Sequence, residues 1–177
     1  MRKLSLSELN RISVGQYKEA EKTSIIIILD NVRSLNNIGS VFRTADAFRL
    51  EAIFLCGITG IPPNKEIHKT ALGATDSVSW KYFENAVDAI DKVKKQKYRV
   101  YAVEQAEGSI LISDFISADG EKIALVFGNE VQGVEEKVMQ CVNGCLEIPQ
   151  YGTKHSLNIA VSAGIVIWEI FKKLKKS

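Results

Sequence analysis

Three polar segments of the sequence carry side chains whose types and spacing could bind a ligand. In the first, Asn37, Ser40 and Arg43 stand in a predicted helix that follows a polar loop. Free backbone N–H groups at a helix start, together with the donor fork of a guanidinium, favour an anion such as phosphate. A capped helix with one surface arginine would explain the same residues, and this segment alone favours that simpler interpretation.

The second segment, Gly128-Asn-Glu130-Val-Gln-Gly133, follows an apolar run that ends at Phe127. Because glycine has no side chain, a ligand can approach the backbone closely at Gly128. Glu130 then supplies a carboxylate just beyond the strand. The pattern G-x-E-x-x-G also fits an ordinary turn, so it indicates little by itself.

The third segment contains a strand that ends at Pro149 and a polar loop that leads into the last helix. Ser156 is predicted to be the N-cap of this helix, because its hydroxyl can accept a backbone N–H. The first turns of the helix are rich in small residues, which indicate close packing against another backbone: Ala160, Ser162, Ala163 and Gly164.

The elements that position these segments alternate between strands and helices. Apolar runs predict strands at residues 24–30, 52–56, 77–83, 99–103, 123–127 and 144–148, and helical patterns lie at 5–20, 37–48, 65–72, 86–97, 134–141 and 156–173. We therefore expect an α/β fold with a mostly parallel sheet flanked by helices. Such sheets bind ligands at the carboxyl ends of their strands.

Length and composition limit the class of protein. The chain has 177 residues, 46% of them hydrophobic and 25% charged, which is typical of one soluble domain. No apolar run is long enough to span a membrane, and the N-terminus lacks the pattern of a signal peptide. We expect a cytoplasmic protein with a single domain over residues 1–177 and a short N-terminal helical segment at about residues 1–22.

Several common kinds of site are not indicated. Three cysteines without a C-x-x-C pair, and only two histidines, predict no metal site. The glycine-rich fingerprints of dinucleotide-binding and P-loop proteins are absent, as is the G-x-S-x-G nucleophile motif. A net charge of +2 is compatible with RNA binding but does not by itself indicate it.

Together, in order and spacing, the three segments resemble the sequence motifs of the SpoU family, also called TrmH, in the SPOUT superfamily of methyltransferases. The matching residues are Asn37, Gly39-Ser40 and Arg43-Thr-Ala45 in the first motif, Gly128, Glu130 and Gly133 in the second, and Ile148-Pro149, Gly152 and Ser156-Leu157-Asn158 in the third. The resemblance covers nearly the whole chain from Ile25 onward.

The resemblance implies a deep trefoil knot in the C-terminal part of the fold, an exception to the rule that chains are not knotted. It also implies an S-adenosylmethionine site in the loops after two strands, with cofactor contacts from Phe127, Gly128, Ile148, Ser156 and Leu157. This cofactor carries no phosphate, which would explain the missing glycine-rich loop. Family members are homodimers whose active sites draw on both subunits, so a homodimer is expected.

By the same resemblance, the chain would be an RNA (ribose-2′-O-)-methyltransferase acting on tRNA or rRNA. The catalytic residues would be Arg43, as the central group, with Asn37, Glu130, Ser156 and Asn158 holding it or the ribose. Because a guanidinium stays protonated, we expect Arg43 to stabilise a developing alkoxide and to fix a neighbouring RNA phosphate rather than to act as a base.

Two further residues beside the third motif are candidates for RNA binding. Lys154 and His155 are expected to contact phosphates, although a plain exposed histidine or a proton shuttle would also fit His155. Two alternatives to the whole interpretation stay open at this point. One is a knotted enzyme that methylates a base, and the other is a non-catalytic RNA-binding protein with the same fold.

Overall fold

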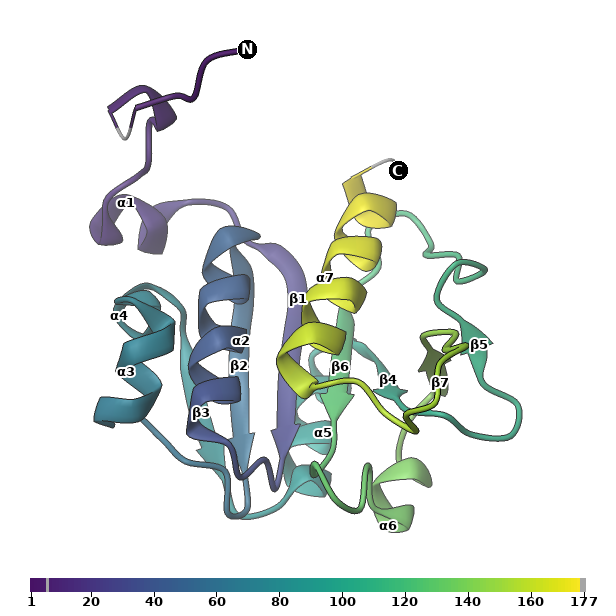
Figure 1. Ribbon diagram of the computed structural model, residues 1–177. Helices are drawn as coiled ribbons and strands as arrows, with labels where there is room; N and C mark the ends of the chain where they lie inside the picture. The colour runs from purple at the N-terminus through teal and green to yellow at the C-terminus, as the bar shows by residue number, and fades with distance from the viewer. Residues whose placement is uncertain (6, 176–177) are drawn as a thin grey trace.

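The computed structural model describes residues 1–5 and 7–175, which form a parallel sheet covered by helices on both faces (Figure 1). Seven strands lie in the order β3-β2-β1-β6-β4-β7-β5. Their bounds are β1 Thr23–Asp30, β2 Leu50–Cys56, β3 Trp80–Phe83, β4 Arg99–Val103, β5 Ile110–Leu111, β6 Ile123–Phe127 and β7 Gly144–Glu147. Every recorded strand pair is parallel, so the expected fold class is confirmed.

β1 lies near the middle of the sheet because its residues are apolar on both faces. Ile25, Ile27 and Leu29 belong to the core on one face, whereas Ile26 and Ile28 belong to the core on the other. None of these side chains is more than 2% exposed. Each contributes roughly 1.5–3 kcal/mol by leaving water. The uninterrupted β-branched run therefore specifies a strand that is covered on both sides.

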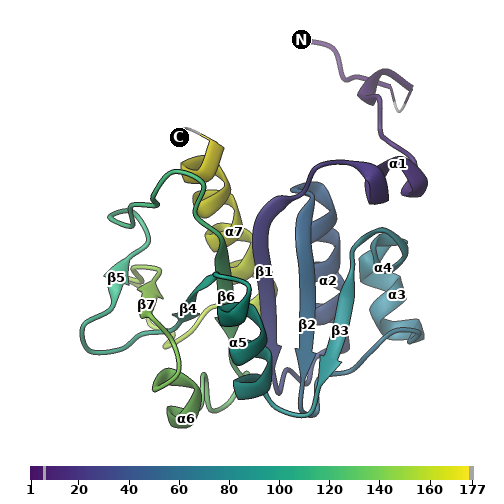
Figure 2. The same cartoon turned by 180° about the vertical axis from the view of Figure 1, so that it is seen from behind.

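The helices divide between the two faces of the sheet. Helices α2 (Leu35–Ala47), α3 (Lys65–Ala71) and α7 (Ile159–Lys175) pack on one face, and α5 (Ala86–Lys95) and α6 (Glu136–Met139) pack on the other. Figure 2 shows α5 in front of the sheet with α2 and α7 behind it. The short helices α1 (Val14–Glu19) and α4 (Ala74–Ser77) and the 3-10 turn Ser7–Leu9 complete the described chain.

Several predicted boundaries are corrected by the structure. The N-terminal pattern gives no continuous helix over residues 5–20, since α1 begins only after Ser13, whose side chain forms a capping box with Gln16. The strand expected at 77–83 begins at Trp80, because Ser77 closes α4. The last helix begins at Ile159 rather than at Ser156. The trefoil knot stays a prediction from the family resemblance.

Two features are absent from the residues that the structure describes. These residues contain no helix with the length and apolar character needed to cross a membrane. Nor do they contain a group of three His, Cys, Asp or Glu side chains that could hold a metal ion.

Candidate functional site

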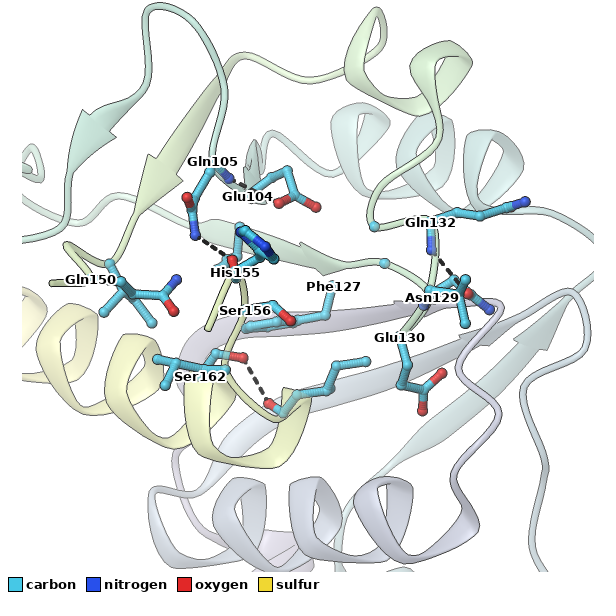
Figure 3. A pocket seen from close by; sticks show the side chains of 17 residues that line it. Glu104, Gln105, Phe127, Asn129, Glu130, Gln132, Gln150, His155, Ser156 and Ser162 are labelled. Carbon is cyan, nitrogen blue, oxygen red and sulfur yellow. Dashed lines mark hydrogen bonds between the residues drawn. The ribbon is translucent and has the colours of Figure 1, made fainter. Parts of the chain in front are cut away.

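A cavity of about 330 Å³ opens at the carboxyl ends of β4, β6 and β7 (Figure 3). It is lined by residues at and after the ends of these strands, together with Ile159 and Ser162 of α7: residues 103–105, 127–133, Ile148, Gln150 and residues 155–157. Parallel strands end at one edge of a sheet, which brings together segments that are distant in sequence. The predicted cofactor residues Phe127, Gly128, Ile148, Ser156 and Leu157 all line this cavity.

Glu130 connects the cavity to the start of α2. Its carboxylate accepts hydrogen bonds from the backbone N–H of Arg33 at 3.0 Å and of Ser34, the N-cap of α2, at 2.9 Å. Burial raises the pKa of Glu130, but these N–H donors and the side chain of Asn37 together outweigh that effect and leave the pKa lowered. An ionised carboxylate near the first turn of a helix is also favoured by the helix dipole. Glu130 thus fixes its loop against α2.

A second contact joins the first and third motifs. The Asn158 amide nitrogen donates to the Asn37 side-chain oxygen at 3.0 Å. The Asn158 side-chain oxygen accepts from the backbone N–H of Ala160 at 2.8 Å, so Asn158, not Ser156, caps α7. Ser156 as N-cap was therefore wrong. Asparagine is as good a cap as serine. At this position the asparagine side chain also contacts Asn37 of α2.

Gly128 has a packing role in addition to the predicted one. A Cβ atom at this position would lie 2.2 Å from the backbone carbonyl atoms of Gly133. The missing side chain therefore admits the backbone of Gly133, and Gly128 also lines the cavity, so its contact with a ligand stays a prediction. Asn129 and Gly133 exchange two backbone hydrogen bonds, of 3.0 and 2.9 Å, which close the loop into a tight ring. This ring is one wall of the cavity.

Asn129 and Glu104 were not predicted, although both shape the cavity. The Asn129 side chain donates to the backbone oxygen of Asn31 and accepts from the backbone N–H of Val131. The Glu104 carboxylate accepts from the backbone N–H of Val134 at 3.2 Å. Glu104 directly follows β4, and Asn129 lies two residues after the end of β6. Their position after parallel strands was the signal that could have identified them.

The predicted RNA-binding residues lie in different places. His155 lines the cavity, and its backbone oxygen accepts from the side chain of Gln105 at 2.9 Å. Lys154, beside it in the loop, is exposed and does not line the cavity. Arg43 is exposed and lines a different hollow, with residues of the N-terminal segment. It lies six residues beyond Asn37 on α2, which is about 9 Å along the helix axis and about 120° around it.

Within one chain, then, Asn37, Glu130 and Asn158 are joined, Ser156 stands beside them at the cavity, and Arg43 is apart. An open parallel sheet with a loop-built cavity at its carboxyl edge is typical of α/β proteins that bind a small molecule at that edge. The chain matches the model of the SpoU rRNA Methylase family over residues 24–168, and it belongs to this family.

Individual relatives agree with this assignment. The chain is 29% identical over 161 residues to a Staphylococcus saprophyticus protein assigned to the TrmH family of tRNA/rRNA methyltransferases, covering 90% of this chain and 63% of that protein. It is 29% identical over 156 residues to a tRNA/rRNA methyltransferase of Borreliella burgdorferi, covering 87% of this chain and 66% of the relative. The chain thus spans less than two thirds of the length of these relatives.

Solved structures share the fold. An AdoMet-bound rRNA methyltransferase from Sinorhizobium meliloti superposes with a TM-score of 0.76 at 26% identity, covering 89% of this chain and 60% of that one. A TrmH/SpoU tRNA modifying enzyme from A. aeolicus superposes with a TM-score of 0.80 at 23% identity, covering 92% of this chain and 83% of that one.

Proposed function

We propose that this chain is an S-adenosylmethionine-dependent methyltransferase that acts on tRNA or rRNA. The observation that carries the proposal is the junction of all three family motifs beside one cavity, which the second and third motifs line. Glu130 of the second motif holds the start of α2, and Asn158 of the third motif binds Asn37 of the first. A protein that used this fold only as a scaffold would not require polar contacts between three separate segments at a ligand cavity.

The chemical character of the cavity fits the proposed cofactor. Phe127, Ile148 and Leu157 supply apolar surface for an adenine ring, and the carboxylates of Glu104 and Glu130 suit a ligand that carries positive charge. Its volume of about 330 Å³ lies within the range of small-molecule sites. When bound, S-adenosylmethionine supplies a methyl group activated by its sulfonium. The chain's own residues bind it and orient it toward the acceptor.

We propose a ribose 2′-hydroxyl as the acceptor and Arg43 as the residue that contacts it. Its guanidinium would stabilise the oxygen as it loses its proton and would hold an adjoining phosphate. His155, which lines the cavity, and Lys154, beside it in the loop, would contact further phosphates of the RNA. The combination of Arg43 with Ser156-Leu157-Asn158 supports ribose rather than a base as the acceptor.

We also propose that the active protein is a homodimer. The separation of Arg43 from the cavity supports a site in which the arginine of one subunit serves the cavity of the other. Val161, Gly164, Ile165 and Trp168 share one side of α7, and the three apolar side chains are 51%, 40% and 49% exposed. A Cβ atom at Gly164 would meet no atom within 4 Å. The stripe is therefore open to close packing by a helix from a second copy.

The experiment that tests the proposal supplies methyl-labelled S-adenosylmethionine and total RNA from a host that lacks this gene. The RNA is then digested to nucleosides for mass spectrometry, in parallel with a direct measurement of cofactor binding. We expect a 2′-O-methylated nucleoside from the wild type and none from Arg43→Ala, which should still bind the cofactor. A methylated base would refute the ribose acceptor, and the absence of cofactor binding would refute the enzyme itself.

A further inference from the structure

A second hollow, of about 580 Å³, lies at the opposite end of α2 from the cofactor cavity. It is enclosed by residues 9–14 of the N-terminal segment, by the second half of α2 and by the turn at residues 71–77. Figure 1 shows that the N-terminal segment approaches α4 at the amino ends of the strands, away from the edge where β4, β6 and β7 end. We call this hollow the arginine groove.

The groove takes its name from Arg11, Arg43 and Arg49, which all line it and are all exposed. Among the residues that the structure describes, no carboxylate forms an ion pair with any of the three. Of the other three described arginines, Arg2 and Arg99 form ion pairs with carboxylates, and Arg33 does not. The groove thus gathers most of the unpaired guanidinium groups of the described chain.

The acidic residues of the groove do not cancel this charge. Asp46 accepts a hydrogen bond from the hydroxyl of Ser77, and Asp76 is the other carboxylate in the lining. Three guanidinium groups against two carboxylates leave an excess of positive charge. Each guanidinium also presents donors in a planar fork, a geometry that matches the oxygens of a phosphate.

The backbone at Arg49 adds a second observation. Arg49 adopts a left-handed conformation, with φ of 49°, in the tight turn between α2 and β2. A non-glycine residue pays roughly 1–2 kcal/mol for this conformation, and glycine or asparagine would be the ordinary choice. The turn therefore holds an arginine at a position whose backbone conformation favours glycine or asparagine.

We infer that the arginine groove binds the phosphodiester backbone of the RNA substrate next to the nucleotide contacted by Arg43. This inference rests on the proposed function, because it takes RNA as the substrate. Arg11 and Arg49 would each hold a neighbouring phosphate, so the N-terminal segment that supplies Arg11 becomes part of the RNA-binding surface. Contacts of this kind set the position of the RNA and do not read its sequence.

The test compares Arg11→Ala and Arg49→Gly with Lys94→Ala. Glycine at position 49 keeps the left-handed turn, and Lys94 is an exposed cation on α5, on the other face of the sheet. Binding of end-labelled total RNA from the gene-deficient host is measured by filter retention at several salt concentrations. Cofactor affinity and methyl transfer are measured on the same preparations.

Each groove variant should lose one phosphate contact. The slope of log affinity against log salt should then be shallower by about 0.7–0.9, so a fourfold rise in salt weakens the variant about threefold less than the wild type. Lys94→Ala should keep the wild-type slope, and cofactor affinity should be unchanged in all three variants.

Two outcomes would overturn the inference. If the wild type transfers methyl groups to RNA but the groove variants behave like Lys94→Ala, the groove does not bind RNA, and the proposed function stands. If the groove variants instead change the oligomeric state measured by light scattering, with an unaltered salt slope, a second copy of the chain covers the groove. A wild type that neither binds the cofactor nor transfers a methyl group fails at the proposed function.

Discussion

Replacing Asp30 with asparagine should stabilise the protein at neutral pH. Asp30 ends β1 and is 2% exposed. One carboxylate oxygen accepts from the side chain of Asn31 at 3.0 Å, but the other is buried without a hydrogen-bond partner. Burial, reinforced by the nearby charge of Glu135 and opposed by Lys137, raises the pKa of Asp30 from 3.8 to about 6. Compared with the unfolded chain, the folded protein therefore favours the protonated form of Asp30.

The size of the effect follows from the two pKa values. At about 1.4 kcal/mol per pKa unit, the change from 3.8 to about 6 corresponds to roughly 3 kcal/mol. Because the folded-state pKa is raised, this stability is fully present below about pH 4 and is lost as the pH rises through about 6. Asparagine keeps the shape of the side chain and the acceptor for Asn31 but carries no charge at any pH.

The assay is urea-induced unfolding of the wild type and Asp30→Asn, followed by circular dichroism at intervals between pH 4 and pH 8. Above pH 7 the variant should be more stable by up to about 3 kcal/mol, and the difference should vanish near pH 4. Asp91→Asn, on the exposed surface of α5, removes the same charge and should show no such trend. A variant that is less stable at neutral pH, or a difference that does not depend on pH, would refute the reasoning.

Three further substitutions test the contacts around the cavity. Glu130→Gln should lower the melting temperature at pH 7 by about 2–4 °C, because a carboxylate with a lowered pKa stabilises the fold at pH values above its ordinary pKa of 4.5. The difference between variant and wild type should shrink as the pH falls below 4.5. Asn158→Ala should cost about 0.5–2 kcal/mol of unfolding free energy in a urea titration, whereas Asn158→Asp, which keeps the cap, should cost less. Gly128→Ala should weaken cofactor binding at least tenfold by calorimetry, because its Cβ would strike the backbone of Gly133, whereas Gly152→Ala, where a Cβ meets no atom within 4 Å, should bind normally; equal affinities would contradict the proposed role of the close approach.

Strand and helix identities could be predicted because they depend on local patterns. The β-branched run of β1, and the alternation that follows it, indicated a parallel sheet whose carboxyl edge would carry the site. The two-residue strand β5 could not be predicted, since Ile110 and Leu111 become a strand only by pairing with β7. The N-cap of α7 was also beyond local rules, because Ser156 and Asn158 are equally suitable until the contact with Asn37 is known.

The motif glycines show the same limit more clearly. Gly39 belongs to the first motif, yet a Cβ atom there would lie 2.2 Å from the backbone oxygen of Ile67. Its role is to let α2 and α3 approach each other, not to bind a ligand. Gly128 likewise admits Gly133. A sequence shows that a side chain is missing, but only the fold shows which neighbour takes its place.

The order of strands has a consequence for the protein as it leaves the ribosome. A nascent chain that ends before β7 already contains the residues of six strands, but β5 has no partner and the cavity lacks the lining residues that lie between Ile148 and Ser162. Residues 144–162, which supply β7 and this part of the lining, take about 1–4 s to synthesise at about 5–20 residues per second. During that interval the strands already made can pair while the proposed cofactor has no complete site, so this cofactor would stabilise only a chain in which residues 144–162 have already packed.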